Sequence, residues 1–270
     1  MGNGIKMILD INRLIEKLDF AYDVSEFINT FTMDEAEYEK YKKMFYEDFM
    51  LFLRSIKSKE DKYLFSLKLY ICLAAENYDL ITKRLYEKES VLTDNGLNPE
   101  TVYFDTISDI RIWQEVHKRR TGEIGLSELY WVANCVRGDL YRFGRLQFEP
   151  DKSTDIVHMH IPEGKSLDVC ECIKNINLAK DFYDGYSRFD CESWLLSPNI
   201  LSLLSQESNI RKFQALFDVQ HIKYDFAQAS ERVLNEAYSR GQNSSLYHKL
   251  KEYVKENGDP GIGYGAYKKP

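Results

Sequence analysis

The stretch HMHIPEGKSLDV, residues 158–169, decides how the second half of the chain folds. Its first residues alternate between polar and apolar, as in a strand, and Pro-Glu-Gly then predicts a turn. Ser166, a residue type favoured at helix N-caps, precedes a helical spacing of apolar residues that continues to about Tyr183. The stretch therefore predicts a strand, a short turn and a helix in immediate succession.

Further strands surround this unit. Alternation and turn residues predict strands at 139–150, 155–161, 189–197, 219–226 and 261–267. Helical spacing falls between them, at 198–217, 229–238 and 244–255. The first two strands are expected to form a hairpin, whereas later strands are separated by helices. The second half is therefore predicted to be α+β, or mixed α/β.

The first part of the chain is predicted to be helical. Apolar and aromatic residues follow helical spacing in runs at 8–18, 34–58, 59–89, 106–117 and 126–136. Such wide aromatic stripes are typical of helix-on-helix cores, although they can also form an interface, so an oligomer stays open. Two glycines in RRTGEIGL break the pattern. We place the boundary there, which gives a helical domain at 1–120 and a second domain at 121–270.

Composition excludes several classes of protein. The chain has 270 residues, 44% of them hydrophobic, and a formal charge of −7, which argues against nonspecific binding to nucleic acid or to an anionic membrane. Its five cysteines lack a disulfide or zinc spacing, so we expect reduced thiols. No signal peptide or membrane span is evident at the N-terminus. A cytoplasmic protein is the expectation.

The two histidines of the opening stretch allow a metal hypothesis. His158 and His160 lie on one face of the predicted strand because side chains alternate. A divalent metal would need a third ligand, for which Glu149 or Asp190 is available. The simpler interpretation is that both histidines form hydrogen bonds with neighbouring side chains. We expect no metal.

The turn itself allows a phosphate hypothesis. A helix start offers free N–H groups and a partial positive charge, Gly164 permits close approach, and Lys165 adds a cation. Glu163 and Asp168 add negative charge, and neither GxGxxG nor a P-loop pattern is present. An ordinary strand-to-helix corner that binds nothing is the alternative.

Several segments in a fixed order carry a family resemblance. They cover most of residues 106–265: TISDIRIWQEVHKRRTGEIGLSELYWV, YRFGRLQFEP, HIPEGKSL, FDCESWLLSPNI, SNIRKFQALFDV and NSSLYHKLKEYVKENGDPGIGYG. The chain resembles a bacterial acyltransferase-domain family that joins a helical N-acyltransferase N-terminal domain to a GNAT-like C-terminal domain. The resemblance implies a mixed central sheet, flanked by helices, that splays open between two parallel strands.

The resemblance also implies a reaction. An acyl group, with acetyl as the first expectation, passes from acyl-CoA to an amine of a small molecule or peptide by direct attack. Acetyl-CoA or another acyl-CoA is then the co-substrate, and no nucleic acid or membrane partner is expected. Of the usual glycine-rich phosphate pattern this loop keeps only Gly164. A non-catalytic GNAT-like binding or regulatory module is the alternative, and a metal-dependent enzyme using His158 and His160 is a third possibility.

Candidate site residues follow from the implied fold. The catalytic candidates are His160 as base or loop anchor, Glu149 and Glu192 as further bases, and Cys191 as a nucleophile or an inert buried thiol. The cofactor-binding candidates are Ile161, Glu163, Gly164, Lys165, Ser166, Leu167 and Asn209. The substrate-binding candidates are Arg145 and Gln147, expected on one face of the strand at 139–150, and Ser193.

Overall fold

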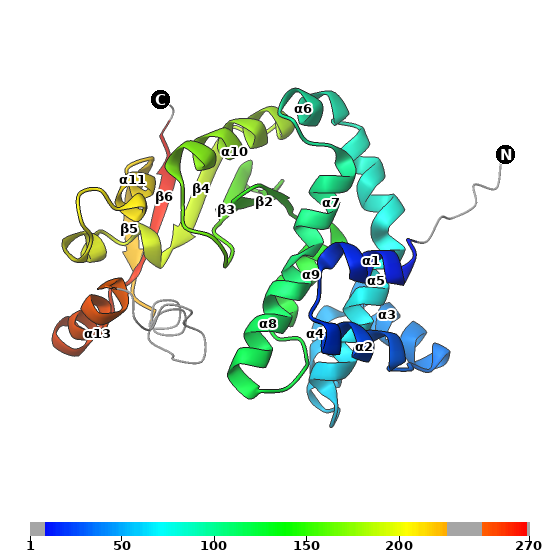
Figure 1. The fold of residues 1–270 in the computed structure, drawn as a ribbon. Helices are drawn as coiled ribbons and strands as arrows, with labels where there is room; N and C mark the ends of the chain where they lie inside the picture. The colour runs from blue at the N-terminus through cyan, green and yellow to red at the C-terminus, as the bar shows by residue number, and fades with distance from the viewer. Residues whose placement is uncertain (1–8, 226–244, 269–270) are drawn as a thin grey trace. The chain divides into compact units, whose positions relative to one another are not determined.

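The computed structural model describes residues 9–225 and 245–268 (Figure 1). The chain divides into two compact units, Met1–Leu140 and Tyr141–Pro270. The sequence placed this boundary at residue 120. The difference arises because the helix Leu129–Arg137 packs against helices of the first unit, so the first unit extends about 20 residues further. The predicted helix at 229–238 lies outside the described residues.

The first unit is helical, as predicted. Its described helices are α1 (Ile11–Leu18), α2 (Tyr22–Thr30), α3 (Glu35–Glu47), α4 (Phe49–Lys57), α5 (Lys62–Tyr86), α6 (Glu89–Asp94), α7 (Pro99–Ile107), α8 (Asp109–Thr121) and α9 (Leu129–Arg137). Helix α5 packs against α1, α4, α7, α8 and α9, and it is buried on most of its surface. It therefore forms the centre of this unit.

Aromatic residues fill the core of the helical unit. Phe45, Phe52 and Tyr70 are almost fully buried and pack edge-on or tilted against one another. The hydroxyl of Tyr70 donates to the Leu129 carbonyl oxygen at 2.7 Å, which satisfies its polar end. The run predicted as one helix at 34–58 is broken at Asp48. Its carboxylate accepts from the Leu51 N–H at 2.8 Å and thereby starts a new helix.

The second unit is built on a six-stranded sheet. Its strands are β1 (Tyr141–Phe143), β2 (Leu146–Asp151), β3 (Ile156–His160), β4 (Arg188–Ser193), β5 (Phe217–Lys223) and β6 (Ile262–Tyr267). Their order is β1-β2-β3-β4-β6-β5, and in it β3 and β4 are the parallel pair. The α-helices among the described residues of this unit are α10 (Val169–Phe182), α11 (Asn209–Gln214) and α13 (Ser245–Asn257). The predicted α+β class is confirmed.

The two faces of this sheet differ in chemistry. Helix α10 covers one face (Figure 1), where Phe143 packs against Phe182 and where Met159 and Cys191 are buried. The opposite face carries polar side chains, because neighbouring residues of a strand point to opposite sides. Its polar members on β2, β3, β4 and β6 are Gln147, Glu149, Asp151, His158, His160, Arg188, Asp190, Glu192 and Tyr264. We call this second side the histidine face.

Several boundaries differ from the sequence prediction. The strand predicted at 139–150 is the hairpin of β1 and β2, and the helix predicted at 198–217 is a 3-10 helix at Pro198–Leu203 followed by α11. The strand predicted to continue to Ser197 ends at Ser193, whose Oγ accepts from the Leu195 N–H at 3.2 Å and starts a 3-10 helix at Trp194–Leu196. The N-cap of α10 is Asp168 rather than Ser166. The Asp168 carboxylate accepts from the Glu171 N–H at 2.9 Å, and Ser166 stays in the loop. No helix within the described ranges is long and apolar enough to cross a membrane.

Candidate active site

The parallel ladder between β3 and β4 ends inside the sheet. Its last pair is Met159 with Cys191. Beyond that pair, His160 still aligns with Gln147 on β2, while Glu192 and Ser193 align with Tyr264 and Gly263 on β6. Each strand therefore continues with its outer neighbour after the inner pairing has stopped. This is the splay that the family resemblance predicted.

Gly263 explains why the last strand is rich in glycine. A Cβ atom at this position would lie 2.5 Å from the Leu196 carbonyl oxygen, so the strand and the 3-10 helix after β4 approach too closely for any other residue. This approach fixes the 3-10 helix over β6, at the end of the strand that borders the splay. The glycines thus shape the edge of the candidate site.

His160 forms a pair with Glu149 across β2 and β3. Their Nε2 and Oε2 atoms are 2.8 Å apart, and the two side chains are 26% and 32% exposed. The hydrogen bond from His160 lowers the pKa of Glu149, against the opposing effect of burial. Because an ionised carboxylate only accepts, Nε2 carries the proton in this pair and Nδ1 is the nitrogen that can gain one.

A second histidine lies one step earlier on the same face. His158 Nδ1 is 2.6 Å from Asp190 Oδ1, and the Tyr264 hydroxyl donates to the other oxygen of Asp190. Asp190 is buried, with 4% of its side chain exposed, and its hydrogen bond raises the pKa of Tyr264 to about 12. The carboxylate therefore joins β3, β4 and β6 just before the splay.

The sequence predicted part of this arrangement. Hydrogen bonds from both histidines to neighbouring side chains were the simpler interpretation, and the structure shows them. Asp190 was considered only as a metal ligand, and Tyr264 was not considered. The alternation in each strand places them on a face, but the register that aligns His158 with Asp190 is a property of the folded sheet. In the structure each histidine has a carboxylate of its own. Among the described residues, no group of three or more His, Cys, Asp or Glu side chains is suited to hold a metal.

The β3–α10 loop is held by Arg145. Its Nε donates to the Lys165 carbonyl at 2.7 Å and its Nη1 to the Pro162 carbonyl at 2.6 Å. Arg145 lies in the β1–β2 turn, not on a strand face with Gln147 as predicted, and it is 8% exposed. Its guanidinium is therefore occupied by the loop, so the structure gives it an anchoring contact instead of a substrate contact.

In the β3–α10 loop, two carbonyl groups accept hydrogen bonds from Arg145, whereas several amide groups have no acceptor among the described residues. Within residues 9–225 and 245–268, the N–H groups of Gly164, Lys165, Ser166 and Leu167 donate no hydrogen bond. Gly164, Lys165 and Ser166 are exposed, and Leu167 is buried. Amides of this kind next to the start of α10 are suited to an anion. The cofactor-binding residues predicted in the loop, together with Ile161, thus lie in one short segment after β3.

The other predicted residues lie in different surroundings. Cys191 is buried on the α10 face, and burial raises the pKa of its thiol, which favours an inert thiol over a nucleophile as the interpretation of this residue. Ser193 caps the 3-10 helix and Gln147 is fully buried beside His160 in the register. Glu192 is exposed on the histidine face, and Asn209 is the exposed first residue of α11.

Comparison with known families agrees with this geometry. Residues 140–267 match the family model of the GNAT-like C-terminal domain. Residues 95–138 match the model of the N-acyltransferase N-terminal domain. The chain therefore matches the models of both domains that its sequence resembles, in the same order. No curated protein matches it in sequence.

Solved structures show the same fold. An acyltransferase in complex with decanoyl-CoA and teicoplanin has a TM-score of 0.74 at 18% identity, covering 100% of this chain and 91% of that one. An acyltransferase in complex with decanoyl-CoA has a TM-score of 0.72 at 17% identity, over 96% and 88%. A mutant acyltransferase in complex with octanoyl-CoA also has a TM-score of 0.72 at 17% identity, over 100% and 91%. At these identities the likeness establishes the fold.

Proposed function

We propose that this protein is an acyl-CoA-dependent N-acyltransferase. The observation that carries the proposal is the end of the β3–β4 ladder at Met159 and Cys191, with the His160–Glu149 pair directly beside it. A thioester placed in this splay has a histidine within one residue of the last paired position. The two matching domain families and the acyl-CoA complexes of the similar structures support the same reaction.

The loop at residues 162–167 is the proposed site for the CoA phosphates. The amides of residues 164–167 donate no hydrogen bond within the described residues, the loop precedes the N-terminus of α10, and Lys165 adds positive charge. Arg145 turns two loop carbonyls toward itself. These residues fit a phosphate group, and bound acyl-CoA would supply the thioester that reacts.

His160 is the proposed general base. The attacking amine loses a proton to Nδ1 as its nitrogen forms a bond to the thioester carbon. The carbon–sulfur bond then breaks, and the leaving thiolate takes up the proton that Nδ1 accepted, which returns His160 to its starting form. Glu149 holds the proton on Nε2 through its hydrogen bond and orients the ring. His158 is assigned a positioning role, because its Nδ1 is committed to the buried Asp190.

The similar structures guide the choice of acyl donor and of acceptor. The sequence favoured acetyl, whereas similar structures hold decanoyl-CoA and octanoyl-CoA, and one of them also holds teicoplanin. We therefore propose a small-molecule amine as acceptor and a donor range that extends from acetyl to medium-length chains.

A thiol-release assay tests the proposal. The protein is incubated with acetyl-, octanoyl- or decanoyl-CoA and a panel of amines, and free CoA is measured alongside calorimetric binding of each acyl-CoA. We expect binding and amine-dependent CoA release. Absence of binding at millimolar acyl-CoA would overturn the proposal.

A second candidate function is a GNAT-like module that binds acyl-CoA without transferring the acyl group. The presence of a single glycine, Gly164, in the β3–α10 loop favours it. Matched histidine variants separate the two. His160→Ala abolishes amine-dependent release in an enzyme, while His248→Ala, at an exposed histidine on α13, leaves it unchanged. Binding without release in the wild type, for every donor and amine, would favour the module.

A further inference from the structure

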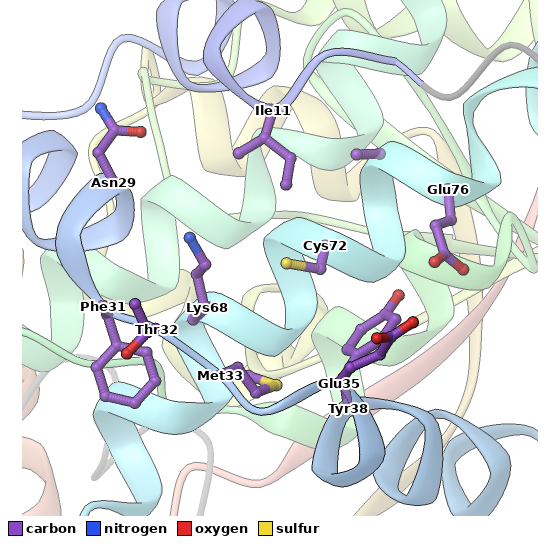
Figure 2. Close-up of a pocket in the computed structure, with 11 residues that line it drawn as sticks. Ile11, Asn29, Phe31, Thr32, Met33, Glu35, Tyr38, Lys68, Cys72 and Glu76 are labelled. Atoms are coloured by element: carbon purple, nitrogen blue, oxygen red, sulfur yellow. The ribbon is translucent and has the colours of Figure 1, made fainter.

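A pocket of about 450 Å³ lies within the helical unit, on one side of α5 (Figure 2). Helix α5 contributes Lys68, Cys72, Ala75 and Glu76, whose spacing places them along one stripe of the helix. The remaining walls come from α1, the last turn of α2, the α2–α3 connection and the first turn of α3. The volume falls in the range of small-molecule sites.

The end of the pocket near Glu76 is electrostatically satisfied. Glu76 forms an ion pair with Lys42 at 2.6 Å. The neighbouring Tyr38 has a raised pKa because it is buried and because Glu76 lies close by, so its phenol stays protonated. A second anion would be repelled from this end.

The opposite end holds a cation. Glu76 and Lys68 are eight residues apart on α5, which corresponds to about 12 Å along the helix. Figure 2 shows them on either side of Cys72. The Lys68 ammonium donates to the Ile28 carbonyl near the C-terminus of α2, where a positive charge is favourable. It has no carboxylate partner among the described residues, and an ammonium has three donors.

The rest of the lining is mainly apolar. Ile11, Phe31, Met33 and Ala75 contribute to it, together with the Cys72 thiol, and Asn29, Thr32 and Glu35 are its further polar members. Burial raises the pKa of this thiol, which therefore remains neutral and acts as a small apolar group. The pocket thus combines one available cation, Lys68, with a mainly apolar lining, and its carboxylates are Glu76 and Glu35, the first residue of α3.

We propose that this pocket binds an alkyl carboxylate. The carboxylate pairs with Lys68 Nζ, and the chain lies over Cys72 and Met33 toward Ala75. A cationic head would face the Lys68 ammonium, and a dicarboxylate would meet Glu76, so a single negative charge on an apolar tail is the matching chemistry. The site lies wholly within residues 11–76 and stands whether or not the chain transfers acyl groups.

Calorimetric titration of the full-length protein with sodium octanoate tests the site. Octylamine, which has the same chain and the opposite charge, serves as the control ligand. Octanoate is expected to bind and octylamine is not. Lys68→Met keeps the length of the side chain and should weaken octanoate binding at least about tenfold, the loss of a charge-assisted contact.

Lys83→Met is the matched control variant, because Lys83 is exposed on α5 outside the pocket. It should bind octanoate like the wild type, with circular dichroism confirming that both variants are folded. No octanoate binding at millimolar concentration, or equal affinity in Lys68→Met and the wild type, would overturn the proposal.

Protection of Cys72 from alkylation tests the position of bound octanoate without a measurement of affinity. Peptide-level mass spectrometry follows alkylation of Cys72 and of Cys170, which is exposed on α10. Saturating octanoate should slow alkylation of Cys72 several-fold and leave Cys170 unchanged. Equal alkylation rates at Cys72 with and without octanoate would show that octanoate binds elsewhere and would overturn the proposed site.

Discussion

The two faces of β3 and β4 are built from alternate residues of the same strands, yet their chemistry is opposite. Cys191 is buried against the α10 side, whereas its neighbour Asp190 accepts hydrogen bonds from His158 and Tyr264 on the histidine face. The environment therefore determines the reactivity of these two adjacent side chains. Burial raises the pKa of the Cys191 thiol and keeps it protonated, whereas two hydrogen bonds stabilise the equally buried Asp190 carboxylate.

The largest difference between the faces should appear in catalysis. His160→Ala removes the proposed base and should lower kcat/KM about 100-fold or more, the usual contribution of general-base catalysis. Thiol release with the best donor and amine measures it. His248→Ala should stay near the wild-type value, and a similar loss in both variants would show that the effect is not specific to the histidine face.

The next largest effect concerns the buried carboxylate. Asp190→Asn should destabilise the fold by about 2 kcal/mol, because it replaces two charge-assisted hydrogen bonds by weaker ones. It should also bring the pKa of Tyr264 down from about 12 toward its ordinary value. Urea unfolding and the difference in tyrosine titration against Tyr264→Phe measure the two changes.

Asp218→Asn, at an exposed aspartate on β5, is the matched control for Asp190. It should leave both the unfolding free energy and the tyrosine titration as they are in the wild type. If Asp190→Asn behaves in the same way as this control, the carboxylate does not join the three strands as we describe.

A smaller effect is expected at the exposed edge of the histidine face. Glu149→Gln should lower the unfolding free energy at neutral pH by about 0.5–1 kcal/mol, since the pair is partly exposed and screened by solvent. The pKa of Glu149 is lowered in the folded state, so its stabilisation is present above the ordinary carboxyl pKa of 4.5 and is lost as the pH falls through the lowered value.

Urea unfolding at several pH values measures this dependence. The difference between Glu149→Gln and the wild type should therefore narrow as the pH is lowered below 4.5. A difference that widens on acidification would show that Glu149 is not stabilised in its ionised form.

The smallest effect belongs to the α10 face. Cys191→Ala should leave kcat/KM unchanged, because the thiol is buried on the side opposite the histidines and its pKa is raised. Intact-protein mass spectrometry during turnover should show no acyl adduct at this position. An acyl adduct on Cys191, or a large loss of activity in Cys191→Ala, would instead support a mechanism in which Cys191 is the nucleophile and forms an acyl-enzyme.

How much of the fold and of the candidate site could be predicted from the sequence depends on how far apart the interacting residues lie along the chain. Local patterns located β3, the turn at Gly164 and the helix after it, because alternation and capping act over a few residues. The aromatic stripe with Phe45 and Phe52 was likewise correctly assigned to a core.

Pairings across strands were not accessible in the same way. Arg145 was assigned to a strand face, although it lies in a turn and reaches carbonyls about 20 residues further along the chain. The contact of Tyr264 with Asp190 spans 74 residues. Such contacts depend on sheet order and register, which one sequence does not specify.

The clamp formed by Arg145 has a consequence for ligand entry. Its planar fork fastens both ends of the β3–α10 loop to the β1–β2 turn, so the loop acquires its shape when the sheet folds and not when a ligand arrives. Little backbone freedom remains to be lost on binding, which favours affinity through preorganisation. A lysine at this position would keep the charge but could not hold both carbonyls in one plane, and the loop would become a hinge.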